Sequence, residues 1–89
     1  MIEKEYTVSN KLGLHARPAS MFVTTTGRFQ CQVKVLKDGQ EIDGKSIMGL
    51  LMLAAGPGSK LFIRADGVDE NDAILALDDL FARRFDDED

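Results

Sequence analysis

The chain contains one histidine, His15, within residues 13–19 (GLHARPA). A helix is expected to begin just after it, and a helix N-terminus presents unpaired N–H groups and partial positive charge. Pro18 is tolerated in the first helical turn, where its missing N–H forfeits no helical hydrogen bond. Arg17 adds a planar cation that recognises phosphate well. His15 could therefore accept a phosphoryl group held by the amides of Ala16 and Arg17; the alternative is a histidine that only caps the helix.

A second segment with chemistry of its own is residues 44–51 (GKSIMGLL), in which Ser46 is the expected N-cap of a helix. Together the two segments resemble the markers of the HPr family, the histidine-containing phosphocarriers of bacterial phosphoenolpyruvate-dependent phosphotransferase systems. Length and element order also resemble that family, so the resemblance covers essentially the whole chain. It implies that His15 carries phosphate on Nδ1, that Arg17 assists and that Ser46 is a regulatory phosphorylation site.

The resemblance further implies a stoichiometric carrier rather than an enzyme with turnover of its own. His15 would take the phosphoryl group from enzyme I and pass it to enzyme IIA-type acceptors, and an HPr kinase/phosphorylase would act on Ser46. No metal and no other cofactor is implied. The alternative is a regulatory binding module of the nitrogen-related branch, which acts by docking. Residues 10–13, residues 50–53 and the acidic tail resemble that branch, whereas residues 44–49 resemble the sugar-transport branch.

Length and composition predict one small domain, residues 1–89, in the cytoplasm. A hydrophobic fraction of 44% is ordinary for a globular protein. No secretory signal is visible, and no apolar run approaches the ~20 residues that span a bilayer. Cys31 is the only cysteine, which excludes an internal disulfide, and one cysteine with one histidine gives no zinc cluster. The net charge of −4 argues against a nucleic-acid partner, and we expect a monomer.

Residue periodicity predicts seven elements in the order βαββαβα. Strands are expected at 2–8, 29–36, 40–43 and 60–65, and helices at 16–26, from Ser46 to 54 or 55, and at 70–84. Asp69 is expected to cap the last helix, and residues 86–89 to form a disordered acidic tail. This order predicts an α+β fold in two layers, with three helices on one face of an antiparallel sheet; a ferredoxin-like arrangement is the alternative. The resemblance implies an open-faced β-sandwich with strand order 1-4-2-3.

Residues 39–46 (GQEIDGKS) match the P-loop pattern letter for letter. A P-loop needs a loop wrapped around phosphates, whereas Asp38-Gly39 is a strong hairpin turn and residues 40–43 read as a strand. Two acidic side chains, Glu41 and Asp43, would also repel the phosphates. We therefore reject nucleotide binding here.

The helix after Ser46 is apolar nearly all round, although a two-layer domain buries only one side of a helix. We expect Leu50, Leu53 and Ala54 to face the sheet; the alternative is a helix buried on all sides. An exposed apolar patch with methionines is typical of a surface that serves several partners. The predicted docking surface consists of the outward residues of this helix and of the first helix: Ser20, Met21, Thr24, Ile47, Met48 and Leu51.

Overall fold

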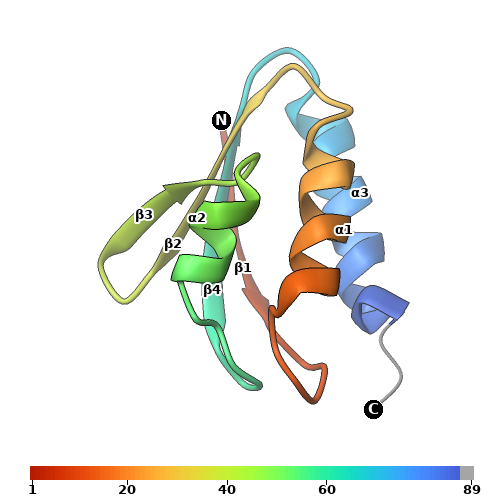
Figure 1. Cartoon of the computed structure of the whole chain (residues 1–89). Coiled ribbons are helices and arrows are strands. Elements are labelled where there is room, and N and C mark those ends of the chain that lie inside the picture. The colour runs from red at the N-terminus through yellow and green to blue at the C-terminus, as the bar shows by residue number, and fades with distance from the viewer. Residues whose placement is uncertain (87–89) are drawn as a thin grey trace.

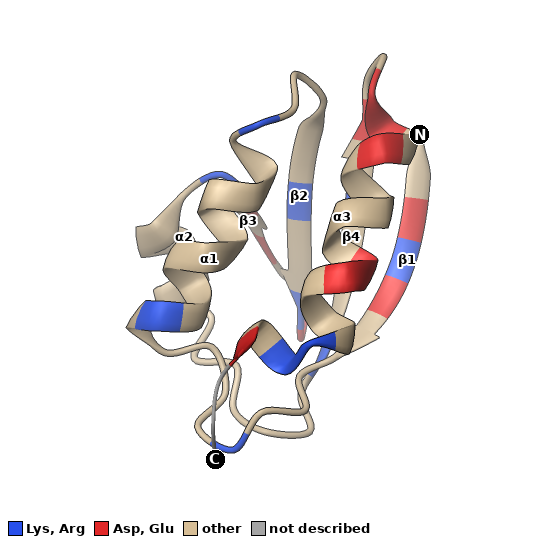
Figure 2. Ribbon diagram, turned by 90° about the vertical axis from the view of Figure 1, so that its right-hand side faces the viewer, with Lys and Arg blue, Asp and Glu red and all other residues tan. Residues whose placement is uncertain are grey.

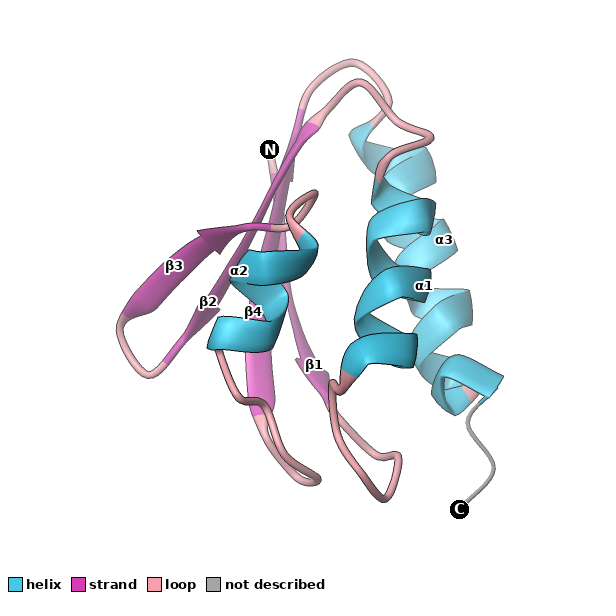
Figure 3. Cartoon of the chain, in the orientation of Figure 1, coloured by secondary structure: helices cyan, strands magenta, loops and turns pink. Residues whose placement is uncertain are grey.

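The computed structural model of the protein describes residues 1–86. Its elements in chain order are β1 (Ile2–Thr7), α1 (Ala16–Thr26), β2 (Gln32–Lys37), β3 (Gln40–Asp43), α2 (Ile47–Met52), β4 (Lys60–Asp66), α3 (Glu70–Ala82) and the 3₁₀ turn η1 (Arg84–Asp86). The four strands form one antiparallel sheet in the order β1-β4-β2-β3, and the helices lie on one side of it (Figures 1 and 3). The predicted α+β open-faced sandwich and its strand order are confirmed.

Alternating burial along the strands explains why the helices cover only one face. In β4, Leu61, Ile63 and Ala65 are buried beneath the helices, as expected from the sequence, while the residues between them face the other way. The helices contribute Phe22 of α1 and Leu77 of α3 to the same core, both fully buried. Each layer thus buries one apolar face against the other.

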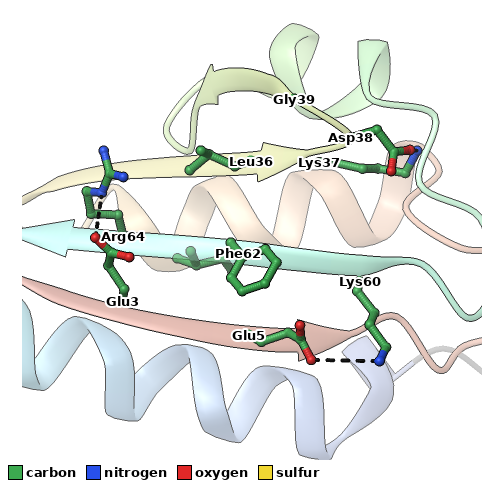
Figure 4. Close-up of a pocket in the computed structure, with 10 residues that line it drawn as sticks. Glu3, Glu5, Leu36, Lys37, Asp38, Gly39, Lys60, Phe62 and Arg64 are labelled. Carbon is green, nitrogen blue, oxygen red and sulfur yellow. Dashed lines mark hydrogen bonds and ion pairs between the residues drawn. The ribbon is translucent and has the colours of Figure 1, made fainter.

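The opposite face of the sheet is open, with the helices behind it (Figure 4). Phe62 stands near its centre with 51% of its surface exposed, above a hollow of about 370 Å³. Ion pairs flank the ring: Arg64 lies 3.3 Å from Glu3, and Lys60 lies 3.9 Å from Glu5. The open face is therefore separated by the whole sheet from residues on the helices.

The hairpin between β2 and β3 has the predicted two-residue turn. Asp38 and Gly39 both have positive φ, 51° and 80°, as a type I′ turn requires. Lys37 pairs with Gln40 across the turn, and residues 40–43 continue as β3. The segment that matches the P-loop pattern is thus a turn and a strand, as predicted, and does not have the conformation that wraps phosphates.

The second strand begins at Gln32, three residues later than predicted, because Asp69 binds the preceding backbone. The Asp69 carboxylate accepts hydrogen bonds from the N–H groups of Gln30 and Cys31, both at 2.8 Å. Those N–H groups are turned toward the start of α3 and not toward a neighbouring strand. Asp69 is the N-cap residue of α3, as predicted, but its carboxylate makes no capping hydrogen bond to the described helix.

Other element ends also differ from prediction: β2 and β4 each extend one residue further, to Lys37 and Asp66. β1 ends at Thr7, because the N–H of Val8 donates to the Ser59 carbonyl and not to a strand. Helix α2 ends at Met52, and Ala54 has a left-handed φ of 50° that no helix can continue; its side chain is exposed and does not face the sheet. Helix α3 ends at Ala82, and residues 84–86 take left-handed φ values of 51–58°.

The structure describes the C-terminal segment as far as Asp86. Phe85 is buried in the core, where its ring lies 4.9 Å from that of Phe81. Asp86 belongs to η1, so the predicted disordered tail does not begin at residue 86. Residues 87–89, the rest of that predicted tail, lie outside the described residues.

We expect Asp69→Asn to lower stability at neutral pH, by roughly 3–6 °C in Tm for the weakening of two hydrogen bonds. The N–H groups of Gln30 and then Cys31 hold the pKa of Asp69 below its ordinary value of 3.8, despite opposing desolvation. A lowered pKa means that Asp69 stabilises the fold fully above pH 3.8, and that this contribution is lost as the pH falls through the lower folded value. Thermal unfolding of wild type and variant from pH 7 to pH 2 measures this contribution of Asp69 to stability.

The wild-type and Asp69→Asn curves should converge at low pH. Asp72→Asn is the control, because Asp72 is exposed in the first turn of α3. A difference between wild type and Asp69→Asn that stays constant across this pH range would contradict a role for the Asp69 carboxylate.

Candidate functional site

His15 is the residue from which helix α1 begins. Its backbone is extended, with φ −81° and ψ −169°, and its carbonyl accepts the N–H of Ala19 at 3.0 Å. The imidazole makes no capping hydrogen bond to the described helix, so the alternative of a histidine side chain used as a helix cap is not supported. The side chain is half-buried. His15 therefore lies at the positive end of α1, and its ring makes no hydrogen bond that caps the helix.

The first turn of α1 is suited to an anion. The N–H groups of Ala16 and Arg17 precede the first intrahelical hydrogen bond, Pro18 has no N–H, and Ala19 is the first residue to bond back to His15. No acidic residue lies in this turn. The ribbon of α1 carries no Asp or Glu along its length, whereas β1 and α3 carry several (Figure 2). Arg17, the second residue of the helix, is exposed.

The loop before His15 is fixed against the turn that follows α2. The N–H of Leu14 donates to the Ala55 carbonyl at 2.8 Å. Gly13 has φ +71°, and a Cβ built on it would lie 2.4 Å from the same carbonyl oxygen. Only glycine fits there, because the backbones of the two loops touch. The glycine of the histidine motif thus has a packing role that its position in the sequence did not reveal.

Ser46 is the N-cap of α2, as predicted. Its Oγ accepts the N–H of Gly49 at 3.1 Å, and its own N–H donates to the Asp43 carbonyl at 3.0 Å. The residue is half-buried. The next residue back, Lys45, donates from Nζ to the Phe29 carbonyl at 2.6 Å and ties this turn to the segment after α1.

The predicted docking residues lie on two helices that pack against each other. Ile47, Met48 and Leu51 are exposed, Met48 by 64%, which confirms the expected exposure of α2 and excludes a helix buried on all sides. Leu50 and Leu53 face the core, as predicted. On α1, Ser20 and Thr24 are exposed and Met21 is half-buried. We call these six residues the α1–α2 surface: Ser20, Met21, Thr24, Ile47, Met48 and Leu51.

His15 and Ser46 mark opposite ends of the α1–α2 surface. The start of α1 is joined to the turn after α2 through Leu14 and Ala55. The end of α1 is joined to the turn before α2, because Thr26 Oγ1 donates to the Gly44 carbonyl at 2.9 Å. The two helices therefore run antiparallel (Figure 1). A charge on Ser46 would lie across the surface from the histidine.

Sequence reasoning missed three residues around this site. Leu12, in the loop before His15, is 69% exposed, and Met52 extends the exposed apolar side of α2. The apolar character of α2 on every side was the available signal for Met52. Asn10 is completely buried in the same loop. Its spacing to Gly13 is typical of a turn, but burial of a polar residue in a loop could not be read from the sequence.

Cys31 lies outside this site. It is buried, and burial, followed by the nearby Asp69 carboxylate, raises the pKa of its thiol. A cysteine that disfavours its thiolate is a weak nucleophile. Among residues 1–86, no cluster of three or more His, Cys, Asp or Glu side chains is placed to hold a metal ion. None of the helices in these residues combines the length and apolar character that a bilayer crossing requires.

Comparison with known proteins decides the family. The family model described as the PTS HPr component phosphorylation site matches residues 2–83. The chain belongs to the HPr family. The phosphocarrier protein HPr of Cupriavidus necator is 47% identical over 85 residues, which cover 96% of each chain. The chain is accordingly a phosphocarrier of the phosphotransferase system.

Solved HPr structures share this fold closely. The crystal structure of HPr-C-His from Thermoanaerobacter tengcongensis has a TM-score of 0.94 and 43% identity, and covers 99% of each chain. A crystal structure of an HPr dimer from the same organism has a TM-score of 0.77 and 44% identity, over 96% of this chain and 98% of that one. The expectation that this HPr-family chain is a monomer stays a prediction.

Proposed function

We propose that His15 accepts a phosphoryl group from phospho-enzyme I and passes it to enzyme IIA-type acceptors. The observation that carries this proposal is the position of the histidine at the N-terminus of α1, beside Arg17 and without an acidic residue in the turn. In this role the chain is a carrier that forms a phosphohistidine between two enzymes. We place the reaction in the cytoplasm.

In the proposed step, the lone pair on Nδ1 of neutral His15 attacks the phosphorus of the donor's phosphohistidine in line. The new N–P bond forms as the old one breaks, and the electron pair of the old bond returns to the donor imidazole. The charge on the phosphoryl oxygens is met by the N–H groups of Ala16 and Arg17 and by the Arg17 guanidinium. Both bonds are N–P bonds to imidazole, so the transfer is close to reversible, as a shuttle needs.

The α1–α2 surface is the proposed docking site for donor and acceptors. It combines exposed methionine and aliphatic side chains of α2 with the polar outward residues of α1, next to His15. Flexible methionine side chains can repack against different partners. The same apolar surface can thus serve enzyme I and then the enzyme IIA-type proteins.

The proposal is tested by incubating the protein with enzyme I and radiolabelled phosphoenolpyruvate. We expect one phosphate per chain, in a linkage that is lost in acid and stable in base. Adding an enzyme IIA-type protein should then move the label off this chain. A chain that takes up no label, or that holds the label in an acid-stable linkage, would contradict the carrier function.

We also propose that phosphorylation of Ser46 by an HPr kinase/phosphorylase regulates docking. A phosphate there adds roughly two negative charges at the edge of the α1–α2 surface, beside Ile47 and Met48. A partner that covers this apolar surface would have to desolvate that charge. Because Ser46 lies at the end of the surface away from the histidine, regulation would act on encounter and leave the chemistry at His15 intact.

Ser46→Asp should therefore raise the apparent KM for enzyme I several-fold, on the order of 1 kcal/mol, and lower the maximal rate less. Aspartate is a good N-cap, so Tm should change little. Ser46→Ala is the matched control: it should lose about 1 kcal/mol of stability with the cap but keep the wild-type KM. Steady-state phosphorylation kinetics of the three proteins measure this. An unchanged KM for both Ser46→Asp and the serine-phosphorylated protein would leave Ser46 as a helix cap only.

The alternative function, a regulatory module that acts by docking and carries no phosphate, has less support. Family relatives that only regulate lack the histidine, whereas His15 is present and stands at a helix N-terminus. The relative from Cupriavidus necator, 47% identical to this chain, is a phosphocarrier protein.

A further inference from the structure

Asn10 is an unusual residue for the exposed loop that leads to His15. Its side chain is completely buried, although the next two residues, Lys11 and Leu12, are exposed. Burial of an amide costs free energy unless its groups are hydrogen-bonded. Its Nδ2 donates to the Gly13 carbonyl at 2.6 Å. A polar side chain buried in this way stabilises one particular shape of the loop.

The shape that Asn10 holds leads directly to the histidine. The Gly13 carbonyl accepts a second hydrogen bond, from the backbone N–H of His15 at 3.0 Å. The N–H of Gly13 in turn donates to the Asn10 carbonyl at 3.2 Å. Asn10 therefore bonds both polar groups of Gly13, and the same carbonyl oxygen links the Asn10 side chain to the His15 backbone.

The other side of this loop is fixed by the turn after α2. Leu14 donates to the Ala55 carbonyl, and the missing Cβ of Gly13 leaves room for the same carbonyl. The residues just before His15 are thus held between the Asn10 amide and the Ala55 backbone. In-line transfer needs the imidazole, the phosphorus and the helix amides aligned within a fraction of an ångström, so this support matters for rate as well as for folding.

From these contacts we infer that Asn10 is a positioning residue for phosphoryl transfer, which acts through the Gly13 carbonyl on the orientation of His15. The inference rests on the proposed function of His15. The Asn10 amide holds the loop and takes no part in binding phosphate.

The test compares Asn10→Ala with Thr26→Val. Thr26 is also completely buried, and its Oγ1 also donates to a backbone carbonyl, that of Gly44 at 2.9 Å with the Val23 carbonyl at 3.2 Å as a second acceptor, but at the far end of α1. Both variants should lose Tm to a similar extent. Asn10→Ala alone should lower the maximal rate of phosphorylation by enzyme I, about tenfold or more, because misplacing a reacting group is costly. Its KM should stay within twofold of wild type, because the α1–α2 surface is unchanged.

Asn10→Asp is the second variant, because it keeps the size of the side chain but its carboxylate cannot donate to the Gly13 carbonyl. It should lose rate as Asn10→Ala does. All rates are measured on protein shown to be folded by its 1H–15N NMR spectrum, at reduced temperature if needed. Wild-type rates for Asn10→Ala, or a loss no larger than that of Thr26→Val, would overturn the inference. Impairment of Asn10→Asp alone would attribute the effect to charge and also overturn it.

Wild-type protein in the same assay separates the two claims. If the wild type is not phosphorylated by enzyme I, the proposed function itself fails. If the wild type is phosphorylated and Asn10→Ala matches its rate, only the positioning role of Asn10 fails.

Discussion

His15→Ala should abolish phosphorylation by enzyme I while leaving the fold intact. It removes the only imidazole in the chain, so no other side chain can form a phosphohistidine. Stability should change little, because His15 is only half-buried and is not among the core residues. Incorporation of labelled phosphate, together with the thermal melting curve, measures both effects. The expected loss exceeds a hundredfold, a range typical for removal of a nucleophile.

Ser46→Ala serves as the control for this experiment, because it removes the other candidate phosphorylation site and should still be labelled. Undiminished labelling of His15→Ala would show that the phosphoryl group enters elsewhere, and the carrier mechanism proposed for His15 would be wrong.

Arg17→Ala should slow phosphoryl transfer about tenfold or more with little change in Tm. A guanidinium–phosphate hydrogen bond is worth ~1.5–3 kcal/mol, and Arg17 is exposed, so the core does not depend on it. Stopped-flow or quenched-flow kinetics of single-turnover transfer from phospho-enzyme I measure the rate. Arg28→Ala is the matched control: Arg28 lies just beyond the other end of α1, over the Phe29 ring at 5.8 Å. Equal rates for Arg17→Ala and wild type would mean that the amides of Ala16 and Arg17 suffice.

The sequence predicted the features that depend on local chemistry. A two-residue type I′ hairpin turn requires positive φ at both of its positions, and Asp-Gly is one of the few residue pairs that favour this conformation. The hairpin, and with it the rejection of a P-loop, could therefore be predicted from Asp38 and Gly39 alone. Ser46 followed by an apolar run is a local capping signal and was also confirmed. The alternation in β4 identified its buried residues before any partner strand was known.

Features that depend on distant contacts could not be predicted in this way. Asp69 has the sequence signature of a helix cap, yet its carboxylate binds the backbone of residues 30 and 31, which lie far away in the chain. This contact also delays the start of β2. Ala54 ends α2 although alanine is the best helix former, because tertiary packing overrides intrinsic propensity. The strand order came from the family resemblance and not from periodicity.

The candidate site shows the same division. His15, Arg17 and Ser46 were identified from their motifs, and the structure places the first two at the start of α1 and the third at the start of α2. The hydrogen bond between Leu14 and Ala55, which fixes the loop before His15, joins segments whose proximity only the folded chain reveals. The bond between Asn10 and Gly13 is local, but the burial of Asn10 depends on the fold.

The most direct test of the central claim is the location of the phosphorus atom in the phosphorylated protein. We would label the imidazole of His15 with 15N, phosphorylate the protein with enzyme I and phosphoenolpyruvate, and record the 15N–31P coupling by NMR. The account predicts one coupling, to Nδ1 of His15, which disappears when an enzyme IIA-type acceptor is added. Phosphorus on Ser46, on Nε2 of His15 or on no residue of the chain would contradict it.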